Sequence, residues 1–327
     1  MRLPGQKLAV RSFRWTRSRI LGGVVVLGYH RLHHGGEDPY GLAIPLDLFE
    51  AQIALIARRA RPIRLTEAVE ALASGRLPSR GIVITFDDGY ADTVEEALPV
   101  LERSGVPATV FVTTGSPGRH FWWDELADIV LGPPSLPARL DLEVGGARHG
   151  WSIASTPDGQ APNGRTALLH SLASVLRGLN AADRCATLRR LRTWSAREPS
   201  QPSPHRALTP DEIRRLAASP LIEIGAHSVS HPALTFLPDA EQREEIAESR
   251  ARLEAITERR VTSFSYPHGS YAGSTISAVR DAGFTAACCS TPDVMTVRSN
   301  VYALPRLWVE PQDPGRFERW LDRWLAD

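Results

Sequence analysis

Short apolar segments alternate with longer amphipathic segments along most of this chain, and this alternation limits the fold more than any other feature. Runs of four to eight apolar residues predict buried strands, whereas apolar residues spaced three or four apart predict helices. The predicted strands are residues 20–28, 61–65, 82–86, 107–113, 221–225, 263–267 and 283–288. The predicted helices are residues 46–59, 67–75, 91–104, 210–219, 238–257, 274–282 and 317–325. This order is typical of a parallel sheet or an α/β barrel.

The alternation stops at about residue 115 and resumes after about residue 206. The interrupting segment has a helix that begins near residue 121, a hairpin over 139–153 and a helical stretch over 166–193. Because α/β barrels often exceed 200–250 residues as one domain, we interpret residues 20–327 as a single domain that carries this segment as an insertion. A small second domain is the alternative.

A basic segment precedes the first predicted strand. Its six cationic residues are Arg2, Lys7, Arg11, Arg14, Arg17 and Arg19. A basic region followed by an apolar run imitates a signal peptide, but no small-residue cleavage site follows here. The apolar run is also far shorter than the roughly 18 residues that indicate a membrane span. We therefore interpret residues 1–19 as a basic arm, solvated or in weak contact with acidic lipid or a partner. We expect a cytoplasmic or membrane-peripheral protein without a transmembrane segment.

Charge and cysteine content narrow the function. The 38 Lys and Arg residues nearly balance the 37 Asp and Glu residues, which gives a formal charge of +1. A protein with so little net charge has no overall positive potential that would attract nucleic acid, so we expect no nucleic-acid partner. The three cysteines, Cys185, Cys288 and Cys289, form neither a disulfide framework nor a C-x-x-C pair. A reduced compartment is the inference.

Two adjacent carboxylates follow the predicted strand over residues 82–86. Asp87 and Asp88 precede Gly89, so the apolar run stops at a turn. Two ionised side chains repel each other and lose hydration when they are enclosed, and a divalent metal would relieve both costs. The alternative is an ordinary Asp-Asp-Gly turn after a strand.

Two histidines follow a later strand. His227 and His231 are four residues apart, so one helical turn would place their imidazoles on the same side. This pair suits a first-row metal such as zinc, although a hydrogen-bonded or exposed pair in a loop is the alternative. Asp88 and both histidines lie just past the carboxyl ends of predicted strands, where α/β folds carry their active sites. An Asp-His-His set leaves coordination positions open, as a catalytic metal requires.

A third stretch, residues 264–269, follows another strand in the same way. Its Pro267 and Gly269 would shape a loop. His268 is either a ligand or a side chain that packs at the rim.

Taken in order, these stretches resemble the motifs of the polysaccharide deacetylase family with the NodB homology domain, carbohydrate esterase family 4. The resemblance covers roughly residues 22–308 apart from the insertion. Three further segments resemble one branch of the family: Tyr29-His30-Arg31, residues 106–112 and Leu304-Pro305-Arg306. The resemblance implies a distorted (β/α)7 barrel. It also implies metal-dependent hydrolysis of an N-acetyl group, usually on an N-acetylglucosamine-type sugar.

The resemblance also implies roles for individual residues. Asp87 would be the general base, and the metal ligands would be Asp88, His227 and His231. The metal is expected to be Zn²⁺, with Co²⁺, Ni²⁺ or Mn²⁺ as alternatives. The backbone N–H of Tyr90 would donate to the developing oxyanion. Further candidates for substrate contact are Tyr266, Pro267 and Trp123, of which Trp123 could instead anchor the core or the insertion.

The sequence departs from the family pattern at two points. The third motif lacks the arginine that usually pairs with the catalytic aspartate, and Arg306 could supply this charge unless it forms only a surface salt bridge. No histidine follows His268, so the usual late histidine that serves as general acid is missing. His30 could replace it because the first and last strands of a barrel are neighbours. The alternative for His30 is a structural role with a hydrogen bond to the backbone.

The sequence thus predicts a metal-dependent hydrolase that removes N-acetyl groups from an N-acetylated sugar, polysaccharide or glycan precursor. One alternative keeps the site but changes the substrate to an O-acetyl ester or a small-molecule amide. A second alternative is a non-catalytic carbohydrate-binding protein on a deacetylase scaffold. Retention of the base, the ligands and an acid candidate argues against this second alternative.

Overall fold

The computed structural model describes residues 23–33, 35, 38–144, 146–153, 164–197 and 205–325. Its centre is an eight-stranded sheet with the order β11-β10-β9-β6-β5-β1-β12, in which β4 pairs with β5. The pairings between these strands are parallel. The strands are β1 (Val25–Tyr29), β4 (Arg61–Pro62), β5 (Gly81–Phe86), β6 (Ala108–Val112), β9 (Ile222–Ala226), β10 (Ser263–Ser265), β11 (Ala286–Cys288) and β12 (Leu307–Trp308).

The sheet curls so that its two edges approach each other. β1 pairs with β5 on one side and with β12 on the other, where Leu27 lies opposite Leu307. A bridge between Cys288 and Leu304 joins the β11 edge to the segment that leads into β12. The predicted α/β fold with a distorted parallel barrel is confirmed, and the carboxyl ends of its strands meet at one rim.

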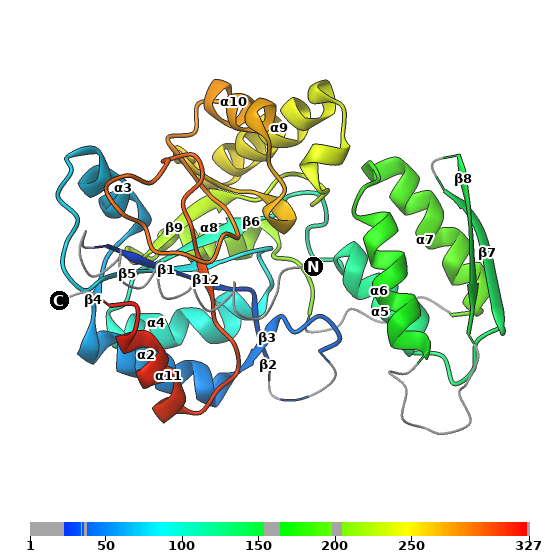
Figure 1. Ribbon diagram of the computed structural model, residues 1–327, viewed down its shortest axis with the longest axis horizontal. Helices are drawn as coiled ribbons and strands as arrows, with labels where there is room; N and C mark the ends of the chain where they lie inside the picture. Colours follow the sequence, from blue (N-terminus) through cyan, green and yellow to red (C-terminus); the bar gives the residue numbers. More distant parts are fainter. Residues whose placement is uncertain are drawn as a thin grey trace, which may run out of the picture.

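Helices cover the outside of this sheet (Figure 1). One group packs together below the sheet in this view, and α9 and α10 form another group above it. Because β5 is buried along its whole length, its apolar, β-branched sequence suits a strand that is covered on both faces. The helices are α2 (Leu46–Arg59), α3 (Leu65–Ala73), α4 (Leu98–Ser104), α8 (Pro210–Ala218), α9 (Asp239–Thr257), α10 (Gly273–Asp281) and α11 (Pro314–Asp322).

Residues 122–195 form a unit with an apolar core of its own beside the barrel (Figure 1). It consists of α5 (Trp122–Leu131), β7 (Arg139–Val144), β8 (Ala147–Ser152), α6 (Gly164–Leu176) and α7 (Ala181–Ser195). β6 and β9, which precede and follow this unit in the sequence, pair directly with each other. The chain thus leaves the sheet and returns to the neighbouring position. The division into one domain with an insertion stays a prediction.

Several predicted boundaries differ from the structure. The stretch predicted as one helical segment over 166–193 is two helices, α6 and α7. The helix predicted over 91–104 begins as a π-helical turn, η1 (Thr93–Ala97), before α4. Residues 31–33 and 43–45 form two short paired strands, β2 (Arg31–His33) and β3 (Ala43–Pro45). The predicted arm over residues 1–19 lies outside the described residues. None of the helices described is both long and apolar enough to cross a membrane.

Candidate active site

Asp87 and Asp88 stand in a tight turn at the end of β5. The backbone N–H of Asp87 continues the sheet by donating to Tyr29 O at 2.9 Å. Asp88 and Gly89 then have φ of +71° and +83°, and Gly89 N–H returns to Asp87 O at 2.9 Å. A left-handed backbone is costly for a residue other than glycine, and such strain is typical of functional sites. This turn places two adjacent carboxylates at the rim.

His227 and His231 come from the loop that follows β9. The loop does not make the helical turn that would place the two imidazoles on one side, because Ser228 and His231 have φ of +62° and +58°. The loop is held by Glu245 of α9, whose carboxylate accepts the backbone N–H groups of Val229 at 2.9 Å and Ser230 at 2.8 Å. The two imidazoles nevertheless meet, with 3.1 Å between their Nε2 atoms.

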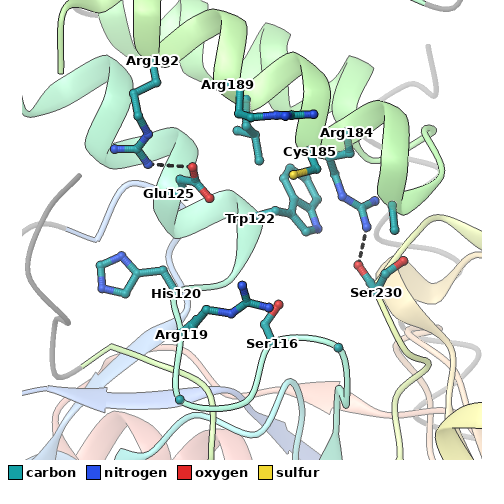
Figure 2. A pocket seen from close by; sticks show the side chains of 14 residues that line it. Ser116, Arg119, His120, Trp122, Glu125, Arg184, Cys185, Arg189, Arg192 and Ser230 are labelled. Carbon is teal, nitrogen blue, oxygen red and sulfur yellow. Dashed lines mark hydrogen bonds and ion pairs between the residues drawn. The ribbon is translucent and has the colours of Figure 1, made fainter. Parts of the chain in front are cut away.

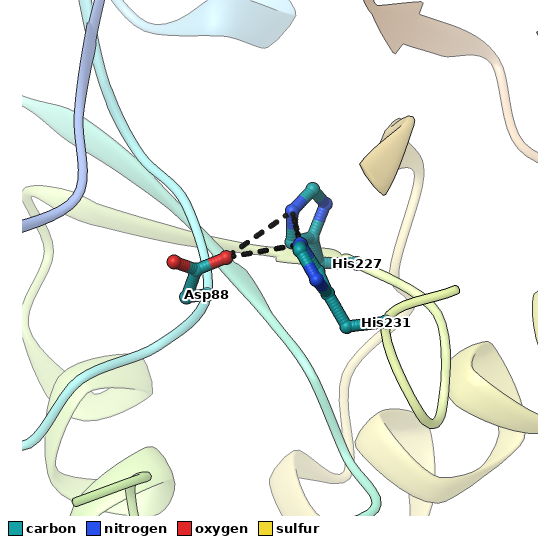
Figure 3. A group of neighbouring side chains, drawn as sticks. All are labelled: Asp88, His227 and His231. Atoms are coloured by element: carbon teal, nitrogen blue, oxygen red, sulfur yellow. Dashed lines mark hydrogen bonds and ion pairs between the residues drawn. The ribbon is translucent and has the colours of Figure 1, made fainter. Parts of the chain in front are cut away.

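The side chains of Asp88, His227 and His231 converge on one point (Figure 3). Asp88 Oδ1 lies 3.4 Å from His227 Nε2 and 3.2 Å from His231 Nε2. Ligands about 2.0–2.1 Å from a tetrahedral Zn²⁺ are separated by about 3.3–3.4 Å, so these three atoms fit one metal ion. His227 Nδ1 lies 2.7 Å from Ser265 O, a contact that orients its Nε2 toward the other ligands.

Asp87 is held by Arg306 in a bidentate pair at 2.6 and 2.7 Å. Arg306 is completely buried, so the alternative of a surface salt bridge is wrong. Its guanidinium also donates to Thr85 Oγ1 at 3.1 Å and to Ser265 Oγ at 2.9 Å. Burial alone would raise the pKa of Asp87, but the charges of Arg306 and His227 hold that pKa below its usual value. Asp87 therefore remains an ionised carboxylate beside the ligand set.

These groups open into a cavity of about 300 Å³. Its lining combines histidine, aromatic and acidic side chains, most of them from the strand ends and from α5 and α6. They are His30, Tyr40, Leu42, Asp87, Asp88, Trp122, Trp123, His170, Ala173, Ser174, Arg177, His227, His231, His268, Ser290 and Trp308.

His30 lines this cavity at the end of β1, as the neighbouring positions of β1 and β12 allow. Its ring stacks on Trp308 with 4.4 Å between centroids. Trp308 fits here because Gly28 has no side chain, and a Cβ at Gly28 would lie 2.6 Å from the indole. Burial lowers the pKa of His30 although Asp88 and Asp87 oppose this effect, so the neutral imidazole is favoured in the resting site.

Two other candidates, Tyr90 and Trp123, lie near the cavity but are held by contacts with each other. The Tyr90 hydroxyl donates to Asp124 at 2.8 Å and accepts from Trp123 Nε1 at 2.7 Å, so the phenol serves packing. Trp123 touches the cavity with its ring 4.5 Å from that of His231, but it is largely buried. The structure therefore favours its role as an anchor.

Tyr266 and Pro267 do not line the cavity, contrary to their expected contact with substrate. Tyr266 is buried, and its hydroxyl donates to Tyr302 O at 2.9 Å. The short turn η3 (Pro267–Gly269) contains His268 with φ of +56°, and this turn directs His268 instead into the cavity. The ring of His268 lies 4.5 Å from that of His231.

Sequence reasoning singled out Trp123 among the cavity residues of the insertion, but none of those on or next to α6. His170 and Ser174 of α6, and Arg177 directly after this helix, reach the cavity from outside the barrel. Their spacing of three and four residues marks one helix face, but the sequence does not state what that face covers. Ser265, on the predicted strand over 263–267, was missed in the same way.

The chain was compared with known proteins. A sequence model of the family described as polysaccharide deacetylase matches residues 74–136 and 169–287. The Bacillus subtilis (strain 168) protein YxkH, whose name places it among the polysaccharide deacetylases, is 21% identical over 314 residues, 95% of this chain and 80% of that protein.

A second relative matches over a shorter stretch. The poly-beta-1,6-N-acetyl-D-glucosamine N-deacetylase of Escherichia coli (strain K12) is 28% identical over 108 residues, 32% of this chain and 15% of that protein. Among solved structures, a Streptococcus pyogenes deacetylase in complex with acetate superposes with a TM-score of 0.55 and 16% identity, over 91% of this chain and 98% of that one. The last likeness supports the fold.

Proposed function

Because the chain belongs to the polysaccharide deacetylase family and is a hydrolase of non-peptide carbon–nitrogen bonds, we propose that it removes N-acetyl groups from an N-acetylglucosamine-type glycan. One observation carries the proposal. Asp87 is fixed by Arg306 as an ionised base, and His227 Nε2 of the ligand set lies 3.7 Å from its Oδ2. A base beside a metal site is what amide hydrolysis requires.

The metal would be held by Asp88, His227 and His231. Two imidazoles and one carboxylate favour Zn²⁺ among the available divalent ions, with Co²⁺, Ni²⁺ or Mn²⁺ as alternatives. When bound, the metal would polarise the amide carbonyl and lower the pKa of a water molecule. His227 is oriented by Ser265 O, and His231 by its loop.

The remaining steps belong to the chain's own residues. Asp87 accepts a proton from the attacking water, while Arg306 keeps the carboxylate in place. We assign His30 as the acid that protonates the amine as its bond to the acetyl carbon breaks. Burial favours the neutral imidazole at rest, so His30 first takes up a proton from solvent and then gives it up readily to the amine. Asp87 returns the proton of the attacking water to solvent. The products are acetate and a free amino sugar.

The cavity suits a sugar. Its volume of about 300 Å³ lies at the lower end of the range for small-molecule sites, and Trp122 and Trp308 provide aromatic walls. The name of the Escherichia coli relative supports a polymer of N-acetylglucosamine as the substrate.

The direct test is acetate release by the purified chain. Oligomers of N-acetylglucosamine are compared with O-acetylated sugars and small acetamides, with and without a chelator. We expect release from the oligomers, its loss with chelator and its return with Zn²⁺. Release from the esters alone would replace the proposed substrate, and sugar binding without any release would indicate a binding protein.

The substitution Asp87→Asn tests the role of the base independently of metal binding. The substitution should abolish turnover while metal content stays near one ion per chain, because Asp87 is not a ligand. Asp47→Asn, at an exposed position of α2, is the control. His227→Ala should lose the metal instead. Retained turnover in Asp87→Asn would remove Asp87 as the base.

His30→Gln tests the acid. The amide keeps the size of the ring approximately but cannot act as an acid, so the rate should fall about 10²–10⁴-fold. Metal content should not change, because His30 is not a ligand. A rate within threefold of the parent chain would transfer the role to another group, and His268, which also lines the cavity, would be the alternative.

A further inference from the structure

A second cavity, of about 480 Å³, lies between the insertion and the barrel rim. Figure 2 shows side chains from α7 on one side and from the loop before α5 on the other, with Trp122 between them. Its charged and titratable lining groups are Arg119, His120, Glu125, Arg184, Cys185, Arg189 and Arg192. Arg189 and Arg192 are three residues apart on α7, and Arg184 lies eight residues before Arg192, so these three arginines lie toward one side of the helix.

The positive charge of this cavity is only partly neutralised. Glu125 is its single lining carboxylate among the described residues, and it pairs with Arg192 at 2.6 Å. Arg119 and Arg189 are exposed, and neither forms an ion pair within the described ranges. Four guanidinium groups against one carboxylate leave a strong preference for an anion.

Arg184 is a fixed cation in the wall. It is buried, and its guanidinium donates to Leu179 O at 3.1 Å and to Ser230 O at 2.5 Å. The guanidinium also lies over the Trp122 ring, 5.2 Å from the centroid. Burial lowers the pKa of Arg184 to about 10, although the charge of Glu245 opposes this effect, so this side chain stays positive at neutral pH. Arg184 forms no ion pair among the described residues.

Two buried donors of the lining also lack a partner. Neither Arg192 Nη1 nor Trp122 Nε1 has a hydrogen bond in the part of the chain that the structure describes. A buried donor left unpaired costs about 1–3 kcal/mol, and a charged donor costs more. Arg192 thus keeps donor capacity that its pair with Glu125 does not use.

The cavity adjoins the candidate active site. Trp122 lines both cavities. Ser230, which accepts from Arg184, directly precedes the ligand His231. Trp122 is thus the wall shared by the two cavities, and a glycan with its acetylated sugar beside the metal ligands would pass this side chain to reach the arginine cavity.

We propose that this arginine cavity binds an oxyanionic substituent, a carboxylate or a phosphate, on a sugar next to the one that is deacetylated. The inference rests on the proposed function and adds the substrate class, an acidic glycan. Guanidinium forks match carboxylate and phosphate oxygens in bidentate pairs, which fixes orientation as well as charge. The apolar faces of Trp122 and Leu188 would contact the sugar that carries the anion.

The test measures binding by calorimetry on the full chain with the Asp87→Asn substitution, which keeps glycans intact. Three probes of equal length are compared: an N-acetylglucosamine tetrasaccharide, the same tetrasaccharide with one 6-phosphate, and a tetrasaccharide that alternates glucuronic acid with N-acetylglucosamine. Arg119→Gln and Arg189→Gln are the test variants, because both side chains are exposed and should tolerate substitution. Arg190→Gln is the matched control on α7, since Arg190 is exposed and lies outside the cavity.

We expect at least one acidic probe to bind more tightly than the neutral one. Arg119→Gln and Arg189→Gln should each weaken that probe about tenfold or more, as the loss of a charge-assisted hydrogen bond predicts. The neutral probe should change less than twofold, and Arg190→Gln should have no effect. Whichever acidic probe responds identifies the anion as carboxylate or phosphate.

Equal affinity for all three probes, or equal losses in Arg190→Gln, would overturn the inference. Acetate release by the unsubstituted chain, measured in parallel, distinguishes this failure from failure of the proposed function. Release from the neutral probe without a preference for acidic probes would leave the function and remove the anion site. Arginine-dependent binding without release from any probe would leave the anion site and remove the function.

Discussion

At the scale of single residues, Arg306 shows how a missing motif residue can be replaced from another strand. The third motif carries Ser265 and no arginine, yet Ser265 Oγ lies 3.1 Å from Asp87 Oδ2 and accepts from Arg306. Arg306 reaches the same carboxylate from the segment before β12. A guanidinium group therefore pairs with Asp87 although it comes from a different part of the chain than the third motif.

Arg306→Gln should raise the pKa of Asp87. The carboxylate loses the charge that opposes its burial, so the acidic limb of the rate profile moves to higher pH, because only ionised Asp87 is a base. Removing one partner of a buried pair also costs about 3–5 kcal/mol of stability. Measurement of kcat against pH and of thermal unfolding checks both effects.

Arg306→Lys is the matched variant, since it keeps the charge but loses the bidentate geometry. The acidic limb of its rate–pH profile should lie at a pH between the acidic limbs of the parent chain and of Arg306→Gln. An unchanged acidic limb in Arg306→Gln would mean that Arg306 does not control Asp87.

Several residues of the candidate active site have a strained backbone. Asp88, His231 and His268 all have positive φ, and all three side chains line the cavity. Each such conformation costs of order 1–3 kcal/mol in a residue other than glycine. The surrounding hydrogen bonds, including His231 N–H to Ser228 Oγ at 3.0 Å, maintain it.

At the scale of elements, α8 is the helix whose start the sequence predicts most directly. Thr209 caps it, Pro210 follows, and Glu212 completes a capping box in which its carboxylate accepts Thr209 N–H at 2.8 Å. Arg206 adds an ion pair to Glu212 at 2.7 Å. These contacts lower the pKa of Glu212 from 4.5 to about 2, with the Arg206 hydrogen bond as the largest cause.

Glu212→Gln should destabilise the chain at neutral pH but not in strong acid. A carboxyl with a lowered pKa in the folded state adds stability above its unfolded pKa of 4.5, and this stability is lost as pH falls toward about 2. The difference in unfolding free energy between the two chains, measured by denaturant titration from pH 7 to pH 2.5, should shrink toward acid. A constant difference over that range would contradict the prediction.

At the scale of the whole molecule, the two apolar cores have separate tasks. The barrel core supports the strand ends that carry Asp87, Asp88 and the ligand loop. The core of the insertion holds α6 and α7, which bring His170 and Arg177 to the catalytic cavity and Arg184 to the arginine cavity. The barrel thus holds the proposed base and metal ligands, while the insertion forms a wall of the cavity beside them.

Leu172→Ala should weaken the insertion more than the metal site. Leu172 is fully buried in the core of the insertion, and its truncation costs about 2–5 kcal/mol. Hydrogen exchange should rise in α6 and α7 while β5 and β9 stay protected and metal content is unchanged. Leu253→Ala, the matched truncation in the barrel core, should expose β9 as well. Equal exchange patterns in the two variants would show one cooperative unit instead.

The sequence alone determined the parallel α/β architecture, because the apolar periods of its strands and helices are local properties. It also singled out Asp87, Asp88, His227 and His231, since carboxylates and imidazoles at strand ends meet wherever parallel strands share a rim. The curl of the sheet, which places β12 beside β1, decided that Arg306 reaches Asp87 and that His30 reaches the cavity.

Tertiary structure alone decided the rest. Tyr266 faces the core and His268 faces the cavity because His268 has a positive φ, which changes the direction of the turn. No local sequence pattern predicts this positive φ. The sequence predicts a helical stretch over 166–193 but not what the arginines of α7 face. They become the wall of a cavity only because the insertion packs against the loop before α5, a contact between segments far apart in the chain.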